Sequence, residues 1–393
     1  MKKQLEGQID MWDTPPSDED KTQNVFTKAE LAEMWKRPVE RQYNVAISKM
    51  LEAIFATKGE MMIGFSGGKD SSLVLDMYCE IISTTPWKDK PICVAFADTT
   101  NETSAMMKFI KEFIEYEEKK WGVTIDFTAV RPPNKLTWVK FVKENGIPLI
   151  SKDQAKRIRT VKADMKKTGV DLDTVERLYM GGMDSVKELQ GLGFRKTSIL
   201  ALTGYVHARD DFGKMFTLSR KWLPMVCCPV DLTEQCCVRI KESTLDSIPN
   251  STNRMTGEQA AESKQRETVY LKTGCNIKLP SGKYVSKPLG AMTNDGVLFS
   301  LQYRNVPICS DYGEIIKTPD GHYKCTKAQR TGCALCGFGC QYDTERFVRL
   351  QETEPTKIRF AFKPMSEGGA GFKEAIEYMN EHCGTKVLIP DVR

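Results

Sequence analysis

Two glycines, one lysine and three serines lie together in the segment Ser66-Gly67-Gly68-Lys69-Asp70-Ser71-Ser72. Glycine permits backbone conformations and close approaches that a Cβ would block, and lysine and serine side chains donate hydrogen bonds to anionic oxygens. The segment therefore predicts a binding site for phosphate or sulfate. The alternative is an ordinary strand-to-helix turn.

A strand and a helix are the elements that would position this segment. Apolar residues fill 61–65, and Leu73, Val74, Met77 and Ile81 recur at helical spacing after the glycines. The glycine turn would then lie at a helix N-terminus, where unpaired N–H groups and a partial positive charge favour an anion.

Two further strands are predicted, at 92–97 and 123–130, with a helix between them. This order predicts an α/β fold, a parallel sheet with helices on both faces. Ligands of such sheets bind at the carboxyl ends of the strands, so Asp98 is predicted to face the same crevice as the glycines. Asp98 would bind ribose, adenine or a magnesium ion, or else cap the following helix.

The 393 residues include 57 basic and 52 acidic ones, and the net charge of +5 is too small to indicate nucleic acid binding by the whole chain. Residues 152–167 alone carry seven basic and two acidic side chains. This segment could bind a nucleic acid, or it could be a helix face exposed to solvent. Without a signal peptide or an 18-residue apolar run, we expect a cytoplasmic protein with no membrane contact.

Three regions are predicted along the chain. Residues 1–25 form a mobile, polar lead-in, and residues 26–270 form the α/β nucleotide-binding domain with a helical insertion near 131–220. Residues 271–393 form a cysteine-rich region and a cap.

The glycine segment lacks the Walker A pattern, because Ile63 and Asp70 stand where that pattern needs Gly and Ser or Thr. Ser-Gly-Gly-Lys-Asp-Ser instead resembles the PP-loop of the ATP pyrophosphatase superfamily. The resemblance implies that residues 66–71 bind ATP or an adenylyl sulfate-type nucleotide, and Asp98 is predicted to join them from the neighbouring strand end. It also implies cleavage between the α- and β-phosphates or binding of an adenylylated sulfur compound.

A second resemblance lies in Thr256-Gly257-Glu258-Gln259-Ala260-Ala261-Glu262-Ser263-Lys264-Gln265-Arg266. This segment is similar to the TG-x-R-x-x-ES-x-x-R signature of the phosphoadenylyl sulfate (PAPS) and adenylyl sulfate reductase family. Glu262, Ser263 and Arg266 match, whereas Gln259 replaces the first arginine. The match implies that Arg266 binds phosphate or sulfate and that Glu262 orients the Arg266 side chain. The alternative is that Arg266 and Glu262 form only a surface ion pair.

Thirteen cysteines favour metal or redox chemistry in a reducing compartment. By resemblance to the adenylyl sulfate reductases, Cys236, Cys237, Cys333 and Cys336 would hold a 4Fe-4S cluster, with zinc as the alternative occupant. A rival local set joins Cys333 and Cys336 to Cys325 and Cys340, and resembles the spacing of the DNA phosphorothioation sulfurtransferases. Cys383 resembles the tail cysteine of the reductases only weakly.

These resemblances imply an enzyme of sulfur metabolism, a nucleotide-dependent reductase or sulfurtransferase, in which Lys69 and Arg266 stabilise the transition-state charge. In a reductase, a thiolate attacks the sulfur of the bound sulfate. In a sulfurtransferase, ATP adenylylates an acceptor such as tRNA or DNA, pyrophosphate leaves, and sulfur replaces the activated oxygen. Either reaction needs a sulfur or electron donor protein. A nucleotide-binding sensor without turnover is the non-enzymatic alternative, and the oligomeric state is left open.

Overall fold

The computed structural model describes residues 24–205, 216–246 and 253–392. Most of the predicted lead-in, residues 1–23, lies outside the described residues. At the N-terminal end of the described chain, two helices precede the first strand: α1 (Lys28–Trp35) and α2 (Val39–Thr57). Thr27 caps α1 and forms a capping box with Glu30, and Pro38 separates the two helices.

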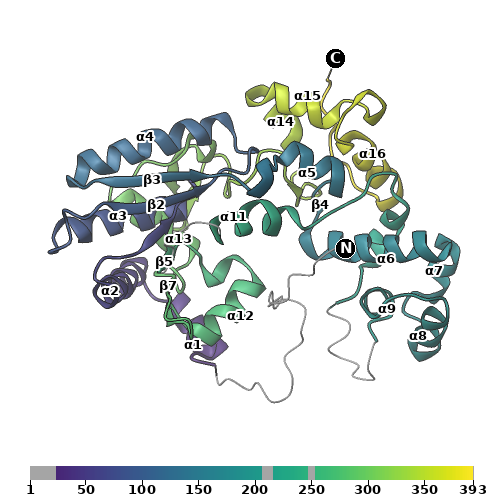
Figure 1. The fold of residues 1–393 in the computed structure, drawn as a ribbon, viewed down its shortest axis with the longest axis horizontal. Coiled ribbons are helices and arrows are strands. Elements are labelled where there is room, and N and C mark those ends of the chain that lie inside the picture. The colour runs from purple at the N-terminus through teal and green to yellow at the C-terminus, as the bar shows by residue number, and fades with distance from the viewer. Residues whose placement is uncertain (1–23, 206–215, 247–252, 393) are drawn as a thin grey trace.

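A six-stranded sheet in the order β3-β2-β1-β5-β7-β6 forms the centre of the fold (Figure 1). Its strands are β1 (Met62–Gly64), β2 (Ile92–Ala97), β3 (Ile125–Val130), β5 (Arg254–Thr256), β6 (Asn276–Lys278) and β7 (Tyr284–Ser286). All neighbours pair in parallel except β6 and β7. A tight turn at Gly282, with φ of +83°, joins those two and reverses the chain. The predicted parallel α/β sheet is thus confirmed, with one antiparallel edge strand.

Helices α3 (Lys69–Ser83), α4 (Ser104–Trp121), α12 (Lys264–Thr273) and α13 (Asn294–Tyr303) flank the sheet together with α2. The apolar sides of α2, α3, α4 and α13 bury a core that includes Ile63, Leu73, Val94 and Phe113, whereas α12 packs against α1 in a smaller cluster that holds Leu31 and Leu271. Burial of nearly every residue in β1 and β2 explains why these two strands read as nearly continuous apolar runs, whereas the edge strand β3 is largely exposed.

A second core joins two parts of the chain that are far apart in the sequence. Helices from residues 138–203 pack against helices from residues 346–383, at the end of the molecule opposite α3 (Figure 1). The helices of the first part are α5 (Trp138–Asn145), α6 (Lys152–Thr168), α7 (Leu172–Leu178), α8 (Gly182–Gly191) and α9 (Lys196–Thr203). Those of the second part are α14 (Arg346–Thr353), α15 (Pro355–Phe362) and α16 (Phe372–Cys383).

The remaining elements are short. They are η1 (Pro133–Lys135), β4 (Leu149–Ile150), η2 (Arg220–Cys227), η3 (Cys237–Glu242), α11 (Ser243–Asp246), η4 (Ala260–Glu262), η5 (Ser310–Tyr312), β8 (Ile315–Lys317), β9 (Tyr323–Cys325), β10 (Gly337–Phe338) and η6 (Met365–Glu367). β4 pairs in parallel with β10, which brings the cysteine-rich loop to the helical region. No helix of the described residues is long and apolar enough to span a membrane.

Candidate functional site at the carboxyl edge of the sheet

The glycine segment forms the turn from β1 into α3, as predicted. Gly67 has φ of +71°, and a Cβ built there would lie 2.3 Å from Met106 Sδ, so only glycine fits against α4. The Ser66 N–H donates to Ser71 Oγ at 3.2 Å, and Ser71 Oγ donates to the Gly68 carbonyl at 2.9 Å. Gly68 is the N-cap of α3 and supplies no side-chain cap. The turn therefore leaves the N-terminus of α3 without a side-chain cap, a geometry that suits an anion.

Lys69 is held within a buried polar chain at this turn. Its side chain is only 4% exposed, and its Nζ lies 2.9 Å from Asp70 Oδ2. The Nε2 of Gln259 donates to the other oxygen of Asp70. Gln259, the residue that stands where the reductases have arginine, thus fixes Asp70, and through it the ammonium group of Lys69.

The loop after β5 lies against the first turn of α3. β5 is the parallel neighbour of β1, with Thr256 opposite Gly64. A Cβ on Gly257 would lie 2.7 Å from the carbonyl carbon of Asp70, so this glycine is required for the close approach. The two sequence motifs are therefore brought together by the sheet.

Arg266 lies in the first turn of α12, and Ser263 caps that helix by accepting the Arg266 N–H at 3.3 Å. Nη1 of Arg266 bonds to Glu262, four residues earlier. Arg330, which the sequence did not single out, donates to the Glu262 carbonyl at 3.0 Å. Glu262 thus orients two arginines, of which the 39% exposed Arg266 keeps donors facing solvent.

Asp98 follows β2 and is 8% exposed, at the edge of the sheet where the sequence placed it. One carboxylate oxygen accepts the Thr100 N–H at 2.9 Å, and the other accepts Nε of Arg131 at 2.9 Å. Thr100 has φ of +62°, so Asp98 stabilises a left-handed turn. Arg131 follows directly after β3, a strand-end cation that the sequence analysis missed.

The CxxC loop is tied to the loop after β2. Cys333 Sγ lies 3.6 Å from Thr99 Oγ1, one residue from Asp98. The N–H groups of Ala334 and Leu335 donate to the carbonyl and to the side-chain oxygen of Asn101, at 2.5 and 3.2 Å. The cysteine loop and the predicted nucleotide crevice therefore share one wall.

A second tie joins the cysteine loop to the glycine turn. The Lys69 N–H donates to Tyr312 Oη at 3.2 Å, and Thr331 Oγ1 donates to the same oxygen at 2.7 Å. Thr331 lies two residues before Cys333. Tyr312 carries no sequence signal, because it lies 243 residues from Lys69 and meets it only in the fold.

The two cysteine pairs Cys236-Cys237 and Cys333-Cys336 lie close enough to interact electrostatically. A hydrogen bond between Cys236 and Cys237 raises the pKa of the first thiol and lowers the pKa of the second. Negative charge on Cys333 and Cys336 further raises the pKa of Cys236, and Lys152 helps to lower the pKa of Cys237. Ninety-five residues separate Cys237 from Cys333 in the sequence, so the fold brings the two pairs together.

The rival cysteine set is split between the two cores. Cys325 lies in the core under the sheet, where burial raises the pKa of its thiol and Lys69 and Asp70 are the charges that act on it. Cys340 lies in the second core, where burial raises the pKa of its thiol to about 12, with Cys336 among the nearby charges. Among the described residues, no three His, Cys, Asp or Glu side chains form a ready metal site.

Cys383 is buried in the second core at the end of α16. Burial raises the pKa of its thiol to about 11, and the charges that act on it are those of Lys221 and Cys228. No base adjoins it in sequence other than His382, whose ring packs on Tyr378 with centroids 4.1 Å apart. The structure does not bring Cys383 to the glycine turn.

The basic segment is helix α6, and several of its cations serve contacts within the protein. Arg159 Nη2 lies 2.6 Å from Glu234. Lys162 is 8% exposed, donates to the Cys228 carbonyl at 2.5 Å and lies 2.7 Å from Asp231. These contacts reduce the charge that α6 could offer to a nucleic acid.

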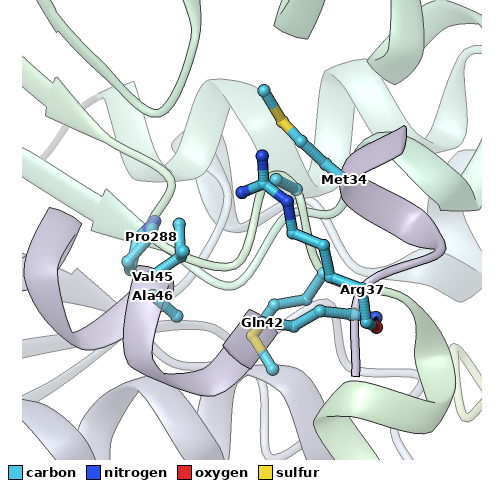
Figure 2. A pocket seen from close by; sticks show the side chains of 8 residues that line it. Met34, Arg37, Gln42, Val45, Ala46 and Pro288 are labelled. Carbon is cyan, nitrogen blue, oxygen red and sulfur yellow. Dashed lines mark hydrogen bonds between the residues drawn. The ribbon is translucent and has the colours of Figure 1, made fainter. Parts of the chain in front are cut away.

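The hollows among the described residues include two that differ greatly in size. The smaller lies between α1, α2 and the turn at Pro288, with Arg37 extending between Met34 and Val45 (Figure 2). Its volume of about 10 Å³ has room for at most one water molecule. The larger, about 450 Å³, lies beside Asp98 and is lined by Thr100, Arg131, Pro132, Lys135, Leu136 and Thr137. Of these two, only the larger has room for a ligand.

Comparison with known proteins adds little to this geometry. No protein-family model matches the chain, and no curated protein matches it. A solved structure of PAPS reductase from Candida auris, in a phosphate complex, matches with 11% sequence identity and a TM-score of 0.32, covering 72% of this chain and 90% of that one. A match at this level carries no argument about function.

Proposed function

We propose that the chain is a PP-loop enzyme of sulfur metabolism, which binds ATP or an adenylyl sulfate-type nucleotide at residues 66–71. One observation carries the proposal: the loop that holds Cys333 is tied both to the end of β2, through Thr99, and to the glycine turn, through Tyr312. A purely structural cysteine loop has no need to line an anion site. The arrangement instead suits sulfur chemistry beside a bound phosphate or sulfate.

In this proposal each residue of the site has a distinct role in binding the nucleotide. The N–H groups at the start of α3 and the ammonium group of Lys69 bind the anion, and Asp70 with Gln259 keeps that ammonium group in place. Arg266 adds a second cation, oriented by Glu262. Asp98 shapes the crevice at the end of β2 and, in this proposal, meets the ribose or a magnesium ion.

A 4Fe-4S cluster held by Cys236, Cys237, Cys333 and Cys336 is part of the proposal. The four thiols suit it because iron–sulfur clusters take four thiolates, and Lys152, Lys241 and Arg346 surround the sulfurs with positive charge. Zinc would accept the same ligands. Binding would draw the two pairs together, as metal binding commonly does. When bound, the cluster would supply electrons or stabilise sulfur intermediates.

The enzymatic test uses anaerobically purified protein with two substrates. Pyrophosphate release from ATP that depends on added tRNA or DNA would assign a nucleic-acid sulfurtransferase. Sulfite release from an adenylyl sulfate in the presence of a dithiol donor would assign a reductase. Binding of nucleotide without either product would leave the sensor function and refute the proposed enzyme.

The ligand test compares Cys236→Ser with Cys325→Ser, two cysteines that distinguish the rival sets. Iron content and the absorption spectrum are measured on each variant purified without oxygen. We expect Cys236→Ser to lose most of the iron and Cys325→Ser to keep it. Retained iron in Cys236→Ser would refute the proposed ligand set, and zinc in place of iron in the wild-type protein would refute the cluster.

A further inference from the structure

Tyr312 lies at the meeting point of the glycine turn and the cysteine loop. It ends the short helix η5 and is 2% exposed. Its hydroxyl oxygen accepts two hydrogen bonds, from the Lys69 N–H at 3.2 Å and from Thr331 Oγ1 at 2.7 Å. One hydroxyl therefore contacts both loops.

The proton of this hydroxyl is not used by either contact. A tyrosine hydroxyl has one donor and two acceptor positions, and both acceptor positions are filled by Lys69 and Thr331. Among the hydrogen bonds of the described residues, none has this hydroxyl as the donor. Burial raises the pKa of Tyr312 to about 12, so the proton stays in place at neutral pH. A buried donor without an acceptor is costly, which indicates that an acceptor belongs there.

The position of the hydroxyl indicates which acceptor that is. A Cβ built on Gly68 would lie 3.3 Å from Tyr312 Oη, so the hydroxyl borders the turn that presents the N-terminus of α3. An anion entering that turn would compete with Tyr312 Oη for the Lys69 N–H, because one N–H makes one good hydrogen bond.

We propose that Tyr312 is a further ligand of the anion bound at the glycine turn, and that it couples occupancy of the turn to the loop holding Cys333. The proposal rests on the proposed nucleotide binding at residues 66–71. In the occupied state the Tyr312 hydroxyl donates to a phosphate or sulfate oxygen and still accepts from Thr331. The Lys69 N–H then donates to the anion instead of to Tyr312 Oη. Tyr312 shifts as this hydrogen bond is lost, and Thr331 shifts with it.

The test measures ATP affinity by titration calorimetry for the wild-type protein, Tyr312→Phe and Thr331→Val. We expect Tyr312→Phe to weaken ATP binding at least about 10-fold, because it removes a hydrogen bond to a charged group. Thr331→Val keeps the tyrosine and should change affinity less than about 3-fold. The matched control is Tyr116→Phe, since the Tyr116 hydroxyl donates to Asn305 O at 3.1 Å, away from the turn.

Hydrogen–deuterium exchange on the same four proteins tests the coupling. In the wild-type protein, saturating ATP should change exchange in residues 331–336 as well as in residues 66–72. Both Tyr312→Phe and Thr331→Val should keep the change in 66–72 and lose most of the change in 331–336. A merely structural role for the tyrosine would instead raise exchange in both variants whether or not ATP is present.

Different results would refute the ligand role of Tyr312, its coupling to residues 331–336, and the proposed function. Tyr312→Phe binding ATP as tightly as Tyr116→Phe would overturn the ligand role, and an unchanged ATP effect on residues 331–336 in both variants would overturn the coupling. Wild-type protein that binds ATP without any change in 331–336 would overturn the coupling alone. Wild-type protein that binds no nucleotide would refute the proposed function and this inference with it.

Discussion

The contact between Gly257 and the first turn of α3 gives a sharp prediction for Gly257→Ala. The added Cβ would lie 2.7 Å from the carbonyl carbon of Asp70, 2.8 Å from its oxygen and 2.9 Å from the Ser71 nitrogen. Ordinary contacts of a Cβ begin near 3.4 Å. All three neighbours are backbone atoms of a helix, so they cannot rotate away as a side chain could.

The size of the effect follows from these distances. The difference of 3.4 − 2.7 Å requires the β5 loop to retreat by about 0.7 Å, and overpacking of this kind costs about 1–3 kcal/mol. The same retreat moves Gln259 away from Asp70, which releases the ammonium group of Lys69. We therefore expect ATP affinity to fall at least about 10-fold, the equivalent of about 1.4 kcal/mol.

The assay pairs urea unfolding with titration calorimetry. The matched control is Gly191→Ala at the end of α8, where an added Cβ has no neighbour within 4 Å. The control should keep its ATP affinity and change the free energy of unfolding by less than about 1 kcal/mol. Gly257→Ala that matches this control in both measurements would refute the argument that the β5 loop holds Lys69 through close packing.

Three further predictions concern stability, each measured by urea unfolding. Burial raises the pKa of Glu117 from 4.5 to about 8, so the folded state holds this proton more tightly than the unfolded state and the free energy of unfolding falls as pH rises from about 4.5 to 8. Glu117→Gln should raise the free energy of unfolding at pH 8 by up to about 5 kcal/mol and flatten its dependence on pH. An unchanged pH dependence in this variant would contradict the prediction. Asp98→Ala removes the acceptor of the Thr100 N–H and should lower stability by about 1–2 kcal/mol, whereas an unaffected protein would show that the turn does not need the carboxylate. Lys162→Met leaves the Cys228 carbonyl without its ammonium donor and should cost about 2–3 kcal/mol, with a loss below about 0.5 kcal/mol speaking against a buried structural lysine.

The sheet and the glycine turn could be predicted because their signals are local. The apolar run at 92–97 and the alternating segment at 123–130 fall on β2 and β3, and the pattern after Lys69 marks α3. Segment 199–205, which periodicity could not assign, is largely helix α9. Short apolar runs fit strand and helix equally well, and only tertiary packing decides between them.

The long-range part of the site could not be predicted in the same way. Tyr312 and Arg131 have no motif, and their roles come from contacts across the fold. In the sequence, Gln259 stands out only because the reductase signature has arginine at this position. In the structure, its side-chain amide donates a hydrogen bond to Asp70. The pairing of residues 138–203 with 346–383 in a second core was likewise invisible, because amphipathic helices do not specify their partners in the sequence.

The central claim is that the turn at residues 66–71 binds an adenine nucleotide beside the cysteine loop. The most direct measurement is equilibrium binding of ATP and of adenylyl sulfate to the wild-type protein and to Lys69→Met. The account predicts saturable binding of at least one nucleotide to the wild-type protein, weakened at least about 10-fold in the variant, whose lost ammonium group is 2.9 Å from Asp70. Equal binding by both proteins, or no binding by the wild-type protein, would contradict it.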